Sequence, residues 1–142
     1  MQRGLITVLV GAAILWFGLS VSAQSNTFKA RLSPVPVESS NVAAITGSGS
    51  VTAVLTGASL SIRGTFEGIK TPATLAQIHL GPRGVRGPVM FDLTVTKAVS
   101  GTISGTIALT PVQVEALKQG RFYVQLHSEK APDGNLWGWI LP

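Results

Sequence analysis

Short runs in which apolar and polar side chains alternate follow one another along most of the chain. Alternation with a period of two predicts β-strands that bury one face and expose the other. In the run 60–66, for example, Leu60, Ile62, Gly64 and Phe66 fall on one face. The pattern predicts strands over residues 28–32, 51–55, 60–66, 75–80, 89–96, 103–109, 121–127 and 135–140.

One segment breaks this period and predicts a helix. Thr110 is a good N-cap residue, Pro111 suits the first helical position, and Gln113 stands three residues after the cap. Gly120 then provides a stop signal. We therefore predict one short helix over residues 111–119, with Leu117 and either Val112 or Val114 turned inward.

Glycine and proline separate the predicted strands. Residues 51–55 and 60–66 flank Gly57 and predict a hairpin, 81–88 predicts a wide surface loop, and 131–134 predicts a turn. The 81–88 loop lacks the Gly-Lys-Ser/Thr ending and the following helix of a phosphate-binding loop. Many short strands and one helix predict an all-β fold, either a β-sandwich or a barrel with Greek-key connections.

The first 23 residues have the three parts of a secretory signal peptide. Arg3 is followed by an apolar stretch from Leu5 to Leu19, and small or modest side chains precede Gln24. The stretch of about 15 residues is short for a membrane-spanning helix, which needs about 20. We expect a signal peptide over 1–23, a single domain over 24–142, no membrane span after cleavage, and a secreted or periplasmic location.

Composition narrows the possible chemistry. The chain has no cysteine, which excludes disulfides, thiolate metal ligands and cysteine nucleophiles. Its formal net charge is +5, but the basic residues are scattered and are not interleaved with aromatic ones, so we expect no nucleic-acid partner. The two histidines do not adjoin a Gly-x-Ser-x-Gly motif, and we expect no enzymatic activity.

Several short motifs, taken in order, resemble the chordin-type (CHRD) domain family across residues 28–140. The motifs are Gly68-Ile69 with Pro72, 76–79, 84–89, 109–114 with Leu117 and Gly120, 122–124, His127-Ser128, 132–134 and Gly138. Where the family usually has His-Ile-His, this chain has Gln77-Ile78-His79. The resemblance implies an immunoglobulin-like β fold, a stand-alone single domain of bacterial style, and an exported protein.

Four side chains are the candidate ligand-binding residues. His79 and His127 each follow a Gln-apolar pair, so we expect them on neighbouring strands. They are either packing residues that bond to loops or two ligands of a copper or zinc ion, completed by Asp133, Glu129 or a partner. Trp137 and Trp139 share a strand face and are either core aromatics or a platform for a sugar or peptide.

These observations favour an exported binding or structural module of the cell envelope or extracellular space. The expected partner is an unknown protein or glycan, and no cofactor is expected. The alternative is an exported protein that binds copper or zinc through His79 and His127. A hydrolase is the third possibility.

Overall fold

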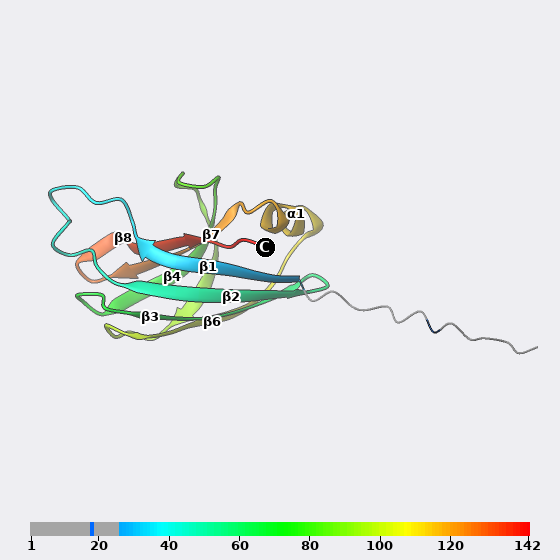
Figure 1. Cartoon of the computed structure of the whole chain (residues 1–142), viewed down its shortest axis with the longest axis horizontal. Helices are drawn as coiled ribbons and strands as arrows, with labels where there is room; N and C mark the ends of the chain where they lie inside the picture. Colours follow the sequence, from blue (N-terminus) through cyan, green and yellow to red (C-terminus); the bar gives the residue numbers. More distant parts are fainter. Residues whose placement is uncertain (1–17, 19–25) are drawn as a thin grey trace, which may run out of the picture.

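Eight antiparallel strands close into a barrel in the computed structural model of the chain (Figure 1). The structure describes residue 18 and residues 26–142. One helix, α1 (Pro111–Lys118), follows β6 in this part of the chain. The strands are β1 (Asn26–Pro34), β2 (Ser48–Thr56), β3 (Ser59–Glu67), β4 (Ala73–Leu80), β5 (Val89–Val95), β6 (Gly101–Ala108), β7 (Phe122–Ser128) and β8 (Ala131–Trp139).

The strand order around the barrel is β1-β2-β3-β6-β5-β4-β7-β8. Strands β4, β5 and β6 are consecutive and antiparallel, and β6 lies beside β3, which precedes them in the chain. This arrangement is the predicted Greek-key connection. The predicted hairpin is also confirmed, because β2 pairs with β3 over their full lengths and Leu55 lies opposite Leu60.

Two short seams close the barrel. Strands β5 and β6 share two paired positions, and β1 and β8 share two more. The other neighbouring strands pair over longer stretches, so two wide halves, β1-β2-β3-β6 and β5-β4-β7-β8, face each other across the core. Of the two predicted architectures, the closed strand order identifies the barrel.

The apolar positions of the alternating runs fill the barrel interior. Leu60, Ile62 and Phe66 of β3 are each at most 2% exposed, and Ile78, Val124 and Leu136 reach the same core from the opposite half. Burial of such side chains stabilises a fold by about 1.5 to 3 kcal/mol each. A cysteine-free chain of this size is therefore held together by apolar burial and by the strand ladders.

The helix α1 forms where the sequence predicts it. Thr110 Oγ1 accepts a hydrogen bond from Gln113 N at 3.3 Å, and Gln113 Oε1 accepts one from Thr110 N at 2.9 Å. Leu117 is fully buried in the barrel core and Val114 packs against it. Of the two valines considered for the inward face, Val112 is 79% exposed, so Val114 is the one that contacts the core.

The predicted turn over 131–134 is wrong, because β8 already begins at Ala131. Ser128 pairs with Ala131, which confines the turn to residues 129 and 130. The β7–β8 ladder shifts register between Leu126 and Ser128, and such a bulge tolerates Pro132, which cannot donate a ladder hydrogen bond.

Two connections fold over the outer face of β4, β7 and β8. One is the predicted loop 81–88, which stands out from the barrel, and the other is the segment 35–47, which leaves the barrel after β1 and extends past its end near β8 (Figure 1). Val35 N donates to Asn135 O, and Asn135 Nδ2 donates to Thr46 O, which anchors the second connection to β8. This face of the barrel is therefore partly covered by the two connections.

The predicted signal peptide, residues 1–23, and its cleavage site before Gln24 lie outside the described residues, apart from Gly18. Within the described part of the chain, α1 is too short and too polar to cross a membrane.

Candidate functional site

The outer face of β4, β7 and β8 brings the four predicted site residues together. In the strand register, His79 lies opposite Tyr123, and Tyr123 lies opposite Trp139. One row further along, Gln125 lies between Gln77 and Trp137. We call these outward positions, together with His127, the imidazole face. The expectation that His79 and His127 lie on neighbouring strands is confirmed, since β4 pairs with β7.

Each histidine is fixed through its Nδ1 atom. His79 Nδ1 lies 2.9 Å from the Gly87 carbonyl oxygen, and His127 Nδ1 lies 2.7 Å from the Pro132 carbonyl oxygen. A carbonyl oxygen can only accept, so Nδ1 carries the proton in both rings. In the neutral imidazole this leaves Nε2 unprotonated, with a lone pair available on each ring.

The two imidazole rings lie close together. Their centroids are 6.4 Å apart, and the His79 ring also stacks on Tyr123 at 5.0 Å. His79 is 7% exposed, whereas His127 is only partly buried. Both line a hollow of about 270 Å³, to which Gln77, Gln125, Arg86 and other side chains contribute.

Burial lowers the pKa of His127 below its ordinary value of 6.5. The nearby His79 and Arg86 lower it further, while the hydrogen bond to Pro132 and the Asp133 carboxylate oppose this shift. The His127 imidazole is therefore predominantly neutral at pH 7.

Loop 81–88 makes further contacts at one end of the imidazole face, in addition to the hydrogen bond between His79 and Gly87. Gly87 N donates to the Tyr123 hydroxyl at 2.9 Å, and Trp139 Nε1 donates to Gly81 O at 3.0 Å. The Arg86 guanidinium lies 5.8 Å from the Trp137 ring and donates to Asp133 O at 2.9 Å. This loop therefore depends on the same aromatic side chains that line the face.

The two tryptophans belong to an aromatic cluster. Their rings meet at 4.8 Å in an edge-to-face arrangement, and Tyr123 lies 4.7 Å from Trp139. Both tryptophans are partly buried. In this edge-to-face packing, ring faces are occupied by contacts with the neighbouring aromatic side chains.

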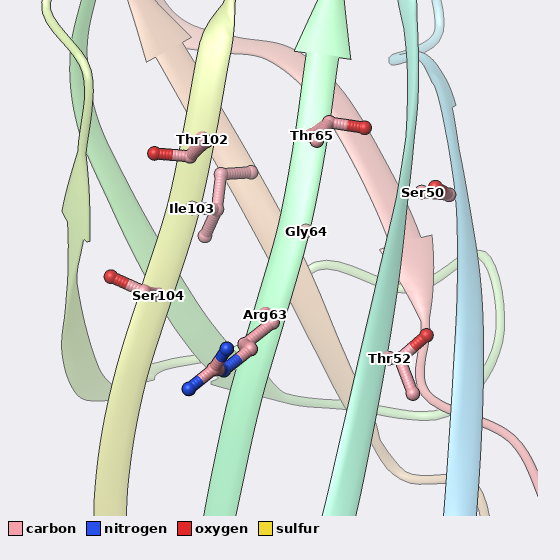
Figure 2. Close-up of a pocket in the computed structure, with 8 residues that line it drawn as sticks. All are labelled: Ser50, Thr52, Arg63, Gly64, Thr65, Thr102, Ile103 and Ser104. Atoms are coloured by element: carbon pink, nitrogen blue, oxygen red, sulfur yellow. The ribbon is translucent and has the colours of Figure 1, made fainter.

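A second surface of different character lies on the open half of the barrel. Strands β1, β2, β3 and β6 turn serine, threonine and basic side chains outward, and Figure 2 shows Arg63 between Thr52 and Ser104. The register gives two rows that cross the strands. They are Lys29-Thr52-Arg63-Ser104 and Arg31-Ser50-Thr65-Thr102. We call these eight residues the hydroxyl face.

The three cations of the hydroxyl face make no ion pairs with the described residues. Among the described residues the one ion pair joins Lys118 and Glu115, so Lys29, Arg31 and Arg63 make none. Glu67, at the end of β3, is the one acidic residue of the four strands. A shallow hollow of about 630 Å³ lies on this face, between Ser50, Thr65, Ser104 and their neighbours.

Comparison with known proteins identifies the family. The model of the CHRD domain matches residues 28–140 of the 142-residue chain. The chain therefore belongs to the CHRD domain family, as its motifs predict. Comparisons with curated proteins and with solved structures find no significant match.

Tyr123 and Gln125 of the imidazole face, and Arg86 of the neighbouring loop 81–88, were not predicted as site residues from the sequence. Tyr123 and Gln125 precede His127 at intervals of two, and that spacing could have placed them on its face. Arg86 could not have been placed, because a loop's path over a sheet has no periodic signal. Neither Asp133 nor Glu129 joins the two histidines as a third metal ligand, since the described residues hold no cluster of three or more histidine, cysteine or acidic side chains.

Proposed function

We propose that this protein is an exported binding module that attaches to acidic polysaccharide through its hydroxyl face. Membership of the CHRD family supports a binding or structural role. The observation that carries the choice of ligand is the pair of rows in which three unpaired cations alternate with serine and threonine hydroxyls. The proposed activity is attachment without bond cleavage.

The spacing of the cations suits a linear polyanion. Neighbouring strands lie about 4.8 Å apart, so Lys29 on β1 and Arg63 on β3 are about 10 Å apart along one row. Arg31 lies two residues from Lys29 on the same strand, about 7 Å away. A chain with a carboxylate on every sugar could therefore meet several cations as it crosses the strands.

The hydroxyls favour a sugar polymer over a nucleic acid. Serine and threonine side chains both donate and accept hydrogen bonds, as sugar hydroxyls do. The hydroxyl face has no aromatic side chain on which a base could stack, and stacking is a main source of affinity for single strands. The net positive charge of the chain adds a general attraction to polyanions.

The test compares two triple variants of equal net charge in titrations with polygalacturonate and with neutral dextran. Lys29→Gln/Arg31→Gln/Arg63→Gln removes the cations of the hydroxyl face. Lys70→Gln/Lys97→Gln/Lys130→Gln removes three exposed lysines from connections between strands. We expect the first variant to bind polygalacturonate about tenfold or more weakly than wild type, a loss of about 1.4 kcal/mol.

The lysine variant should stay within about threefold of wild type, since its charges lie off the rows. Affinity should fall as salt is added, because exposed charges are screened. Equal losses in the two variants would mean that net charge alone drives binding, and binding of wild type to dextran as strongly as to polygalacturonate would rule out the acidic ligand.

A further inference from the structure

The imidazole face contains three buried acceptor atoms that have no hydrogen-bond partner. They are His79 Nε2, His127 Nε2 and Gln125 Oε1. Gln125 is 3% exposed, and its Nε2 donates to the Asp133 carbonyl at 2.9 Å, so Oε1 is the amide atom left free. Leaving a polar group buried without a partner costs about 1 to 3 kcal/mol. Three such groups of one kind around one hollow need explanation.

All three atoms present lone pairs. The Nδ1–H bonds to Gly87 and Pro132 leave Nε2 of each histidine as an acceptor, and an amide oxygen can only accept. Acceptors cannot bond to one another, so the group can be satisfied only by hydrogen-bond donors or by a cation. Histidines that bind metals through one nitrogen usually donate from the other to a carbonyl or carboxylate, as these two do.

We propose that His79 Nε2 and His127 Nε2 bind a divalent copper ion, with Gln125 Oε1 or water in a further position. The proposal is independent of the hydroxyl face. A metal bonded to an imidazole nitrogen at about 2.0 to 2.1 Å lies about 3.2 Å from the centre of that ring, so one ion can join rings about 6.4 Å apart. The observed separation of 6.4 Å is this upper limit, and the two rings are stacked with their planes inclined by 29°. Both lone pairs can therefore meet one ion only if the ring of the partly exposed His127 turns and moves toward His79.

The donor set selects copper. Imidazole nitrogens suit copper and zinc, and the chain has no cysteine thiolate that would favour zinc or monovalent copper. Two imidazoles with a neutral amide form an incomplete site, and among the first-row divalent ions the affinity of a given nitrogen and oxygen site is generally greatest for copper. Zinc should bind the same atoms more weakly.

The charges around the hollow act in opposite directions. Arg86 repels a cation, but its guanidinium is engaged with Asp133 O and the Trp137 ring. The Asp133 carboxylate attracts a cation and is close enough to influence His127. Gln77 Nε2 donates to Asp92 Oδ1 at 2.8 Å, and this hydrogen bond fixes the Gln77 side chain at the edge of the hollow.

The test loads the purified chain with copper and records its electron paramagnetic resonance spectrum. The expected spectrum of the wild type shows hyperfine coupling to two imidazole nitrogens at one equivalent of copper. The variants His79→Gln and His127→Gln should each lose about tenfold or more in copper affinity, since even groups that merely orient a ligand are worth that much. Circular dichroism in the near ultraviolet verifies that each variant is folded.

A second measurement does not depend on any variant. In the wild type, zinc should shift the ¹⁵N resonances of both Nε2 atoms and leave those of both Nδ1 atoms nearly unchanged. Coupling to one imidazole or none, zinc shifts at a single histidine, or undiminished copper affinity in a folded histidine variant would each overturn the proposal. A hollow that holds water alone would give no two-nitrogen spectrum, and that result also counts against it.

Discussion

In His79 and in His127 the two ring nitrogens have different roles, which distinguishes these residues from ordinary surface histidines. In each ring Nδ1 donates a hydrogen bond to a backbone carbonyl oxygen. The acceptor is Gly87 O for His79 and Pro132 O for His127. Nε2 is buried and unbonded in both. The structural and ligand-binding interpretations of these residues are therefore compatible, since one nitrogen serves each.

The depressed pKa of His127 predicts how the stability of the metal-free protein depends on pH. The unfolded chain has the ordinary pKa of 6.5 and takes up a proton before the folded chain does. The contribution of His127 to stability is therefore complete above pH 6.5 and declines as the pH falls from 6.5 through the lower pKa of the folded state.

Urea unfolding of wild type and His127→Gln in a chelator, between about pH 5 and 8, measures this contribution. The free energy of unfolding of the wild type should fall more steeply below pH 6.5 than that of the variant. Parallel curves for the two proteins would contradict the environment described for His127.

At the scale of elements, the helix α1 is a two-turn segment whose stability comes from its packing. Its caps satisfy its first amides, but isolated helices of this length are unstable in water. Leu117 is fully buried in the barrel core, and it is the anchor that holds α1 at the barrel.

Leu117→Ala should lower the free energy of unfolding by about 2 to 5 kcal/mol, the usual loss for a buried leucine. The matched control is Val112→Ala in the same helix, at a position that is 79% exposed, and it should change stability by about 0.5 kcal/mol or less. Chemical denaturation of both variants provides the measurement. A loss below about 0.5 kcal/mol for Leu117→Ala would show that α1 is not docked on the core.

Local pattern was sufficient to predict most elements, because alternation and helix caps act between near neighbours. The capped helix at Thr110 and the hairpin around Gly57 are examples. The turn expected at Pro132 failed because a bulge in the β7–β8 ladder lets proline enter a strand, and a bulge depends on the partner strand. The unbonded state of Gln125 Oε1 depends on packing from three strands and two loops, which no local pattern encodes.

At the scale of the whole molecule, the two halves of the barrel have outer faces with different chemistry. The half that contains β4, β7 and β8 is covered by loop 81–88 and segment 35–47 and contains buried polar atoms. The half that contains β1, β2, β3 and β6 is uncovered and presents the hydroxyl face (Figures 1 and 2). A small ligand on one face and a polymer on the other would therefore not compete for space.

Export remains a prediction that concerns residues 1–23. Protein recovered from outside the cytoplasm should have the mass of a chain that begins at Gln24, because the residues before it are predicted to form a cleavage site. Intact-mass spectrometry gives the answer directly. A mass that includes residues 1–23 would show that the segment is retained, and recovery of the protein only from the cytoplasm would contradict export.

The most direct test of the proposed function is a titration of the ¹⁵N-labelled protein with polygalacturonate, followed by amide chemical shifts. We predict that the shifts concentrate on β1, β2, β3 and β6, centred on Arg63 and Thr52, and that added salt reverses them. Shifts concentrated on β4, β7 and β8 would place the ligand on the imidazole face. That result, or the absence of any shift at saturating polymer, would contradict attachment through the hydroxyl face.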